Sequence, residues 1–143
     1  MNIEQTESKN IYLADDDADD REVFVDALQE LSPDTQLIIS NDGEELMTTL
    51  DDNVPPPPYV IFLDLNMPRK NGYECLREIR RTHKLRDIMV VIFSTTDNRD
   101  SIERTYSLGA NYYIRKPHSF ELLKKAIQTI LLLPLNNKGS NHQ

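Results

Sequence analysis

Five aspartates occupy eight consecutive positions near the start of the chain, in the stretch LADDDADD at residues 13–20. Carboxylates this close repel one another, so a folded protein gathers them for a reason. They can form a solvated helix start, lie in a disordered acidic patch or surround a cation. Asp15 and Asp16 directly follow an apolar run, where a buried strand would end. This pair is therefore the first candidate for chemistry.

Three other polar residues stand at the ends of apolar runs further along the chain. Asp64 follows VIFL, Ser94 ends IMVVIFS, and Lys116 follows YYIR. If these runs are parallel strands, their carboxyl ends lie at one edge of a sheet, where open α/β folds bind ligands. The sequence therefore predicts one site assembled from Asp15, Asp16, Asp64, Ser94 and Lys116.

The alternation of short apolar runs with amphipathic stretches supports this arrangement. Strands are expected at 10–14, 35–40, 59–65, 88–94 and 111–116, and helices at 17–31, 41–52, 73–83, 98–109 and 118–133. Strict alternation predicts an α/β fold, a doubly wound five-stranded parallel sheet of flavodoxin-like order 2-1-3-4-5 in a single (βα)5 domain. We expect this domain at 10–133, between a flexible N-terminal lead at 1–9 and a flexible C-terminal tail at 134–143.

The first helical stretch carries apolar residues at helical spacing. We expect Val23, Phe24, Ala27, Leu28 and Leu31 to share the face that packs against the sheet. The acidic residues that open this stretch suit a helix N-terminus, because the helix dipole favours negative charge there. The stretch therefore predicts a helix that begins beside the candidate site.

Other charged or reactive groups have plainer interpretations. Asp17, Asp19 and Asp20 are expected to be solvated residues of the first helical turn. The basic cluster RRTHKLR at 80–86 is expected to form the solvated end of a helix. Cys75 fits a buried helix position rather than a catalytic thiol, because no partner base accompanies it.

Composition excludes several classes of protein. The 143 residues carry a formal net charge of −8, which argues against a broad basic surface for nucleic acid. The N-terminal stretch lacks an apolar signal core, and the apolar run near the C-terminus is interrupted by Pro, so no membrane span is predicted. The single cysteine excludes an internal disulfide and fits a reducing compartment. We therefore expect a cytoplasmic protein.

The candidate site suits a hard cation and a phosphoryl group. Converging carboxylates without His or Cys favour Mg²⁺, which takes oxygen ligands, over zinc. A carboxylate such as Asp64 can act as a nucleophile. The cation, the Lys116 ammonium and the Ser94 hydroxyl can then stabilise the charge on phosphoryl oxygens.

The chain resembles the receiver domain of two-component response regulators from about Ile11 to about Leu132. The resemblance rests on the acidic pair after the first strand, an Asp before LNMP, a Ser after the fourth strand and KP after the fifth, in that order. The chain is similar to stand-alone, chemotaxis-regulator-like receivers. The segments NMPRKNGYECLREIR and STT are most similar to bacterial receivers paired with phytochrome-type sensor kinases.

The resemblance implies a role for each site residue. Asp64 would accept a phosphoryl group from a histidine kinase, with Ser94 and Lys116 contacting that group. The metal ligands would be Asp15, Asp16, Asp64 and the backbone carbonyl of Asn66. Ser94 and Tyr113 would form the switch that reshapes a protein-docking surface. Lys116–Pro117 could adopt the cis peptide bond that is typical of the family. Self-phosphorylation and autodephosphorylation at Asp64 are also implied.

The expected partners are proteins. The resemblance implies a sensor histidine kinase or phosphotransfer protein, of phytochrome type in the closest sub-family, and a downstream protein target. The apolar ILLLPL at 130–135 either covers the core or extends a homodimer contact through the face of the fourth and fifth helices. Neither nucleic acid nor membrane is expected to bind.

Two alternative functions remain open from the sequence. A phosphohydrolase with an Asp nucleophile usually carries a second carboxylate two residues further on, where this chain has Asn66. A receiver that acts only as a binding module, without phosphorylation, would be expected to lack one of the acidic pair, Asp64 or Lys116, and all of them are present. Phosphorylation at Asp64 separates these functions.

Overall fold

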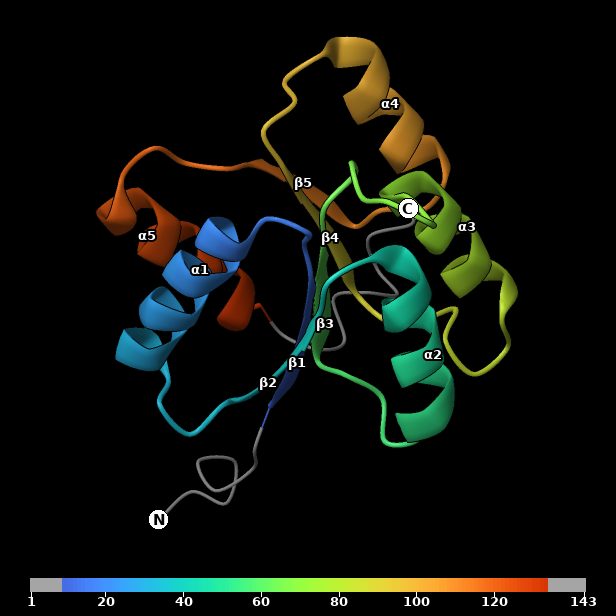
Figure 1. Cartoon of the computed structure of the whole chain (residues 1–143), viewed down its shortest axis with the longest axis horizontal. Helices are drawn as coiled ribbons and strands as arrows, with labels where there is room; N and C mark the ends of the chain where they lie inside the picture. The colour runs from blue at the N-terminus through green and yellow to red at the C-terminus, as the bar shows by residue number, and fades with distance from the viewer. Residues whose placement is uncertain (1–8, 134–143) are drawn as a thin grey trace.

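The computed structural model describes residues 9–133, in which strands and helices alternate along the chain (Figure 1). The strands are β1 (Asn10–Ala14), β2 (Gln36–Ser40), β3 (Val60–Leu63), β4 (Val90–Ser94) and β5 (Tyr112–Arg115). The helices are α1 (Ala18–Leu31), α2 (Gly43–Asn53), α3 (Gly72–Arg81), α4 (Arg99–Ser107) and α5 (Phe120–Leu131). The flexible ends predicted at 1–9 and 134–143 lie outside the described residues, apart from Lys9.

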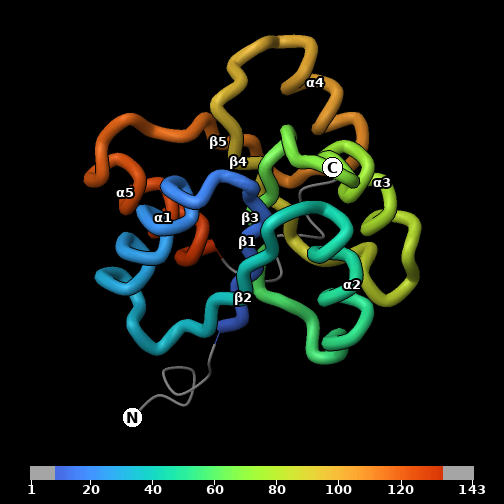
Figure 2. The backbone as a smooth tube through the Cα atoms, viewed as in Figure 1, coloured from blue at the N-terminus to red at the C-terminus, as the bar shows by residue number. Residues whose placement is uncertain are grey.

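The strands form one parallel sheet of order β2-β1-β3-β4-β5, which confirms the predicted flavodoxin-like topology. Helices α1 and α5 cover one face, and α2, α3 and α4 cover the other (Figure 1). In the backbone trace, the chain leaves β1, β3 and β4 at their carboxyl ends, towards the upper part of the view (Figure 2). Residues that follow these strands are therefore brought together, as the sequence predicts.

Each face of the sheet has its own apolar core. Beneath α1 and α5, the rings of Phe24, Phe62 and Phe93 pack edge to face, with centroids 5.0 to 6.2 Å apart. The prediction that Val23 shares this buried face is wrong, because its side chain is 42% exposed. Val23 lies one position before the buried Phe24, at the edge of the helical face, so the core does not reach it.

Polar side chains cap the helix starts at the site end of the sheet. The N-cap residue of each helix accepts a hydrogen bond from a backbone N–H in the first turn, which satisfies one of the free N–H groups of a helix start. The N-cap residues are Asp17, Asp42, Asn71, Asn98 and Ser119. These caps fix where each helix begins relative to the preceding strand.

None of the helices within 9–133 is both long and apolar enough to cross a bilayer.

The basic cluster at 80–86 is not simply solvated, contrary to the sequence prediction. The half-buried Arg80 guanidinium donates to the backbone oxygens of Gly109 and Ile88 at 2.9 and 2.7 Å. It also donates to Oδ1 of Asn111 at 2.8 Å, and the same oxygen accepts from Val90 N–H. Arg80 therefore joins the end of α3 to the strands β4 and β5.

We predict that Arg80→Lys lowers the free energy of unfolding, because a lysine cannot reproduce the planar fork that satisfies these acceptors. The expected loss is about 2 kcal/mol, measured by urea unfolding. The matched control is Arg81→Lys at the next, exposed position, for which a change within about 0.5 kcal/mol is expected. Equal effects of the two substitutions would contradict the role of Arg80.

Candidate functional site

The predicted acidic residues meet at the carboxyl ends of β1 and β3. Oxygens of Asp15, Asp16 and Asp64 all lie within 4.8 Å of one another. Asp15 and Asp64 are 1% and 6% exposed, whereas Asp16 is open to solvent. This arrangement follows from the register of the sheet, because Asp64 N–H donates to the oxygen of Ala14 at 3.0 Å and extends the β1–β3 pairing.

The Lys116 ammonium group links the buried carboxylates from the end of β5. Its Nζ lies 2.8 Å from Asp15 Oδ2 and 3.3 Å from Asp64 Oδ2. A third carboxylate, that of Asp20, lies 2.7 Å from the same nitrogen. Lys116 is 10% exposed, and its Nζ lies 5.7 Å from the centroid of the Phe93 ring. The ammonium is thus enclosed between three carboxylates and an aromatic ring.

Local backbone contacts hold Asp64 in place. Its Oδ1 accepts a hydrogen bond from Leu65 N–H at 2.7 Å, and the oxygen of Leu65 accepts from Gly72 N–H at 2.9 Å. The start of α3 approaches β3 so closely that a Cβ on Gly72 would lie 2.3 Å from the backbone oxygen of Asp64. Glycine is therefore required at position 72 by the close packing of backbone against backbone.

Burial controls the electrostatics of the site. Burial raises the pKa of Asp64 to about 6; Lys116 opposes this rise and the neighbouring Asp15 adds to it. Burial likewise raises the pKa of Asp15, while the neighbouring Lys116 ammonium and a hydrogen bond from Asp17 N–H oppose the rise. Burial alone would lower the pKa of Lys116, but its carboxylate partners raise it, so this lysine stays protonated. The two buried carboxylates are thus incompletely neutralised.

The arrangement fits a divalent cation. Asp15 Oδ2 is buried and accepts no hydrogen bond, so its contact with Lys116 is an ion pair without hydrogen-bond alignment. The donor set consists of oxygens, which suits a hard cation. Asp15, Asp16 and Asp64 would hold that cation. Asn66, the fourth predicted ligand, is exposed just after β3.

The predicted switch residues are joined through the loop after β4. Ser94 is fully buried, and its hydroxyl oxygen accepts a hydrogen bond from Thr96 N–H at 3.3 Å. The Tyr113 hydroxyl donates to the backbone oxygen of Thr96 at 2.6 Å. Asp97, one residue further on, pairs with Arg115 of β5 at 3.2 Å. The loop is therefore tied both to the site and to β5.

Three features of the site differ from the sequence interpretation. Asp20 is not simply a solvated residue of the first turn of α1, because it pairs with Lys116. Arg21 was not identified from the sequence, yet its guanidinium donates to the backbone oxygen of Asp15 at 2.9 Å. The Lys116–Pro117 peptide is trans, since the cis bonds of residues 9–133 precede Pro55 and Pro56.

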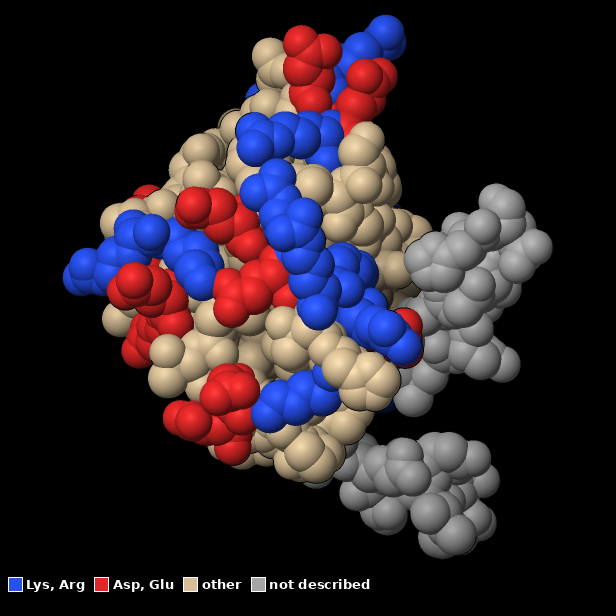
Figure 3. Space-filling model, turned by 90° about the vertical axis from the view of Figure 1, so that its right-hand side faces the viewer, with Lys and Arg blue, Asp and Glu red and all other residues tan. Residues whose placement is uncertain are grey.

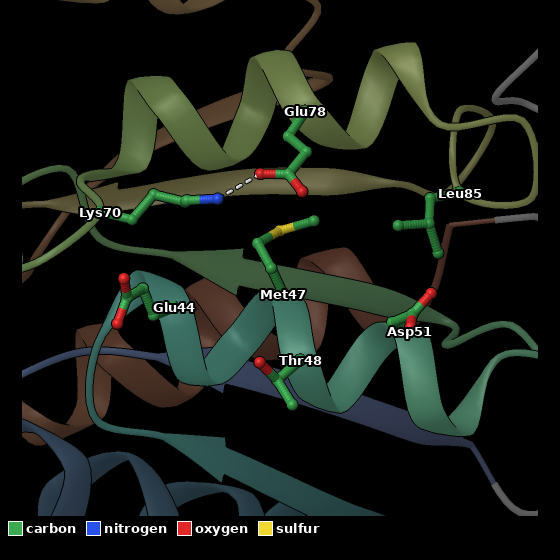
Figure 4. A pocket seen from close by; sticks show the side chains of 7 residues that line it. All are labelled: Glu44, Met47, Thr48, Asp51, Lys70, Glu78 and Leu85. Atoms are coloured by element: carbon green, nitrogen blue, oxygen red, sulfur yellow. Dashed lines mark hydrogen bonds and ion pairs between the residues drawn. The ribbon is translucent and has the colours of Figure 1, made fainter.

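Other surface features lie away from the strand ends. A groove of about 410 Å³ separates α2 from α3, and Lys70 and Glu78 form an ion pair inside it (Figure 4). Figure 3 shows a band of Lys and Arg side chains across the face formed by α2, α3 and α4. On this face the Arg104 guanidinium lies 3.9 Å from the centroid of the Tyr73 ring. Neither the groove nor the Arg104–Tyr73 contact includes a residue of the candidate site.

Comparison with known proteins shows the relationship of the chain. A family model described as the response regulator receiver domain matches residues 11–128. Response regulator Rcp1 of Synechocystis is 34% identical over 134 residues, which cover 91% of each chain. A probable chemotaxis protein CheY of Rhizobium etli is 27% identical and covers 87% of this chain and 93% of its own. The chain spans about half the length of other relatives, such as CpxR of Escherichia coli, at 31% identity and 85% coverage of this chain.

Solved structures give the same relationship. The phosphorylated cyanobacterial phytochrome response regulator RcpA superposes with a TM-score of 0.79 at 33% identity, over 87% of this chain and 91% of that one. The Mn²⁺-bound form of Rcp1 superposes with a TM-score of 0.75 at 35% identity, over 85% and 91% of the two chains. These relatives share both the fold and a substantial part of the sequence.

We predict that Asp64→Asn stabilises the metal-free protein at neutral pH. A carboxyl whose pKa is raised to about 6 by folding binds protons more tightly in the folded state, so stability falls as pH rises from about 4 to about 6. The amide removes this penalty. In EDTA at pH 7.5, urea unfolding should show a gain of about 1–3 kcal/mol.

The gain should shrink towards pH 4.5, where Asp64 of the wild type is largely protonated when folded. The matched control is Asp52→Asn, which removes an exposed charge at the end of α2. A variant no more stable than the wild type at pH 7.5 would contradict the incomplete neutralisation of Asp64.

Proposed function

This chain belongs to the family of response regulator receiver domains, and we propose that Asp64 is its phosphoacceptor in a Mg²⁺-dependent reaction. The donor would be a phosphohistidine on a sensor histidine kinase or phosphotransfer protein. The observation that carries this proposal is the position of Asp64 at the end of β3, between the acidic pair and the Lys116 ammonium. A nucleophile and groups that neutralise phosphoryl charge surround one point.

The proposed transfer is a displacement at phosphorus. A carboxylate oxygen of Asp64 attacks, and the new O–P bond forms while the P–N bond to the imidazole breaks. The leaving nitrogen keeps the electron pair, and the imidazole is protonated by solvent. A carboxyl with a pKa of about 6 is mostly ionised at neutral pH, so Asp64 can act as the nucleophile.

The surrounding residues would stabilise the transferred group. Mg²⁺ held by Asp15, Asp16, Asp64 and the backbone carbonyl of Asn66 would neutralise charge on the phosphoryl oxygens. Lys116, already protonated and close to Asp64, would pair with another of these oxygens. The Ser94 hydroxyl would donate to a third.

Signal output would be a population shift in the loop after β4. When Ser94 turns to the phosphoryl group, its contact with Thr96 N–H is exchanged for the new one. The Tyr113 hydroxyl, bonded to the backbone oxygen of Thr96, would follow this change. The surface formed by α4, β5 and α5 would then present a different shape to a downstream protein target.

The partners and location are inferred from chemistry and family. Receiver domains interact with histidine kinases or phosphotransfer proteins, and similarity to Rcp1 and RcpA supports a phytochrome-type kinase for this chain. A homodimer through the face of α4 and α5 and a cytoplasmic location complete the proposal. The phosphoacceptor domain would extend over residues 10–133.

The alternatives have less support. Asn66 stands where an Asp-nucleophile phosphohydrolase would need its second carboxylate. A binding module without phosphorylation would not need the buried Asp64 and Lys116 to lie 3.3 Å apart. The proposed chemistry instead includes slow self-phosphorylation from small phosphoryl donors and autodephosphorylation of Asp64.

We predict that phosphoramidate with Mg²⁺ adds one phosphoryl group to the wild type. Intact-mass spectrometry should show the product, and hydroxylamine should remove the group because it is an acyl phosphate. Asp64→Asn should show no incorporation, because the amide is not a nucleophile. Asp52→Asn, with an equal loss of charge on the exposed end of α2, should react like the wild type.

The same experiment separates the alternative functions. Full labelling of Asp64→Asn would place the phosphoryl group elsewhere and overturn the assignment. Continuous release of phosphate from a simple phosphomonoester would support a phosphohydrolase. An unlabelled wild type that binds Mg²⁺ would support a binding module.

A further inference from the structure

Asp20 makes the shortest contact with Lys116 among the three carboxylates around it. The Oδ2–Nζ distance is 2.7 Å, compared with 2.8 Å for Asp15 and 3.3 Å for Asp64. The start of α1 fixes this position, because Asp20 N–H donates to the N-cap carboxylate of Asp17 at 3.0 Å. Asp20 is also more exposed than Asp15 and Asp64, since 38% of its side chain is open to solvent.

The Lys116 ammonium and a divalent cation compete for the same oxygens. Asp15 and Asp64 belong to the cluster whose oxygens lie within 4.8 Å of one another, and both also contact Lys116. A cation that enters the cluster draws these carboxylates to itself and weakens their hold on the ammonium. Lys116 then needs another counter-ion if it is to remain buried and charged.

We propose that Asp20 is a positioning residue that holds the Lys116 ammonium at the edge of the site, leaving the oxygens of Asp15 and Asp64 free to bind a divalent cation. Asp20 suits this role because it contacts the ammonium and lies outside the cation cluster of Asp15, Asp16 and Asp64. The inference rests on the cation site of the proposed function and adds a residue to it.

Charge balance supports this role for Asp20. The four carboxylates and one ammonium of the site carry a formal charge of −3, which a divalent cation reduces to −1. Without Asp20, the ammonium has only Asp15 and Asp64 as carboxylate partners among the described contacts. An entering cation must then displace it from both, so the affinity for the cation falls.

The same contact would prepare Lys116 for phosphoryl transfer. Asp20 Oδ2 and Asp64 Oδ2 touch the same nitrogen, so an ammonium held by Asp20 stays within reach of a group on Asp64. The partial exposure of Asp20 keeps the pair adjustable, because a solvated ion pair is weak. Lys116 can therefore turn to a phosphoryl oxygen without leaving a buried charge unpaired.

Isothermal titration calorimetry with Mg²⁺, at fixed ionic strength and without a phosphoryl donor, tests the proposal. Asp20→Asn should raise the dissociation constant by about five-fold or more, whereas Asp19→Asn should change it by less than about two-fold. Asp19 is the matched control, since it lies in the same helical turn and is exposed. Asp20→Glu, which keeps the charge, should recover part of the affinity.

A second cycle separates positioning from loss of negative charge. In a Lys116→Met background no ammonium competes for Asp15 and Asp64, so Asp20→Asn should change the dissociation constant by less than about two-fold. A five-fold loss in both backgrounds would mean that Asp20 acts through its charge alone and would overturn the proposal. Circular dichroism checks folding, and Lys116→Gln replaces Lys116→Met if the latter is unfolded.

The outcomes distinguish this inference from the proposed function. If the wild type binds Mg²⁺ and is phosphorylated, but Asp20→Asn binds Mg²⁺ equally well, the role of Asp20 alone is wrong. If the wild type does not bind Mg²⁺, the cation site fails, and the role of Asp20 fails with it. If Asp19→Asn weakens binding as much as Asp20→Asn, general electrostatics explain the effect and the proposal is overturned.

Discussion

The site depends on one ammonium group enclosed by carboxylates. Burying two ionised aspartates at strand ends costs on the order of several kcal/mol each unless an opposite charge lies beside them. Lys116 supplies that charge to Asp15 and Asp64, but a single positive charge does not neutralise both. Burial, together with the neighbouring Asp15 charge, therefore keeps the pKa of Asp64 raised despite the contact with Lys116. The protein thus keeps a local excess of negative charge, which a divalent cation can relieve.

The parallel sheet makes this concentration of charge possible. Lys116 and Asp20 are 96 positions apart in the sequence, and Lys116 and Asp64 are 52 apart, yet all three meet at one sheet edge. Backbone pairing continues past the strand ends, where Asp64 N–H donates to Ala14 and Lys116 N–H donates to Ser94. Rigid backbone, rather than attraction between side chains, therefore holds the like charges together.

The predictable part of the site is the part that periodic patterns determine. Asp15, Asp64 and Lys116 directly follow apolar strands, so strand order alone brings them together. Asp20 and Arg80 could not be placed in this way. A charged residue near a helix end is compatible with solvent, and its actual partner depends on how that helix packs against other segments. Helical spacing alone would place Val23 in the core, but the packing of α1 leaves it exposed.

The proposed transmission of a signal from this site would require only a short chain of contacts. Ser94 accepts from Thr96 N–H, Tyr113 donates to the backbone oxygen of Thr96, and α4 begins at Arg99 shortly after. A group that recruits the Ser94 hydroxyl would disturb the hydrogen bond from Thr96 N–H. Movement of the Thr96 backbone would then disturb the hydrogen bond from the Tyr113 hydroxyl to the Thr96 carbonyl oxygen. Packed cores resist gradual deformation, whereas a loop held by a few hydrogen bonds can exchange between discrete arrangements. On the proposed function, a phosphoryl group on Asp64 would therefore alter the surface without rearranging the sheet.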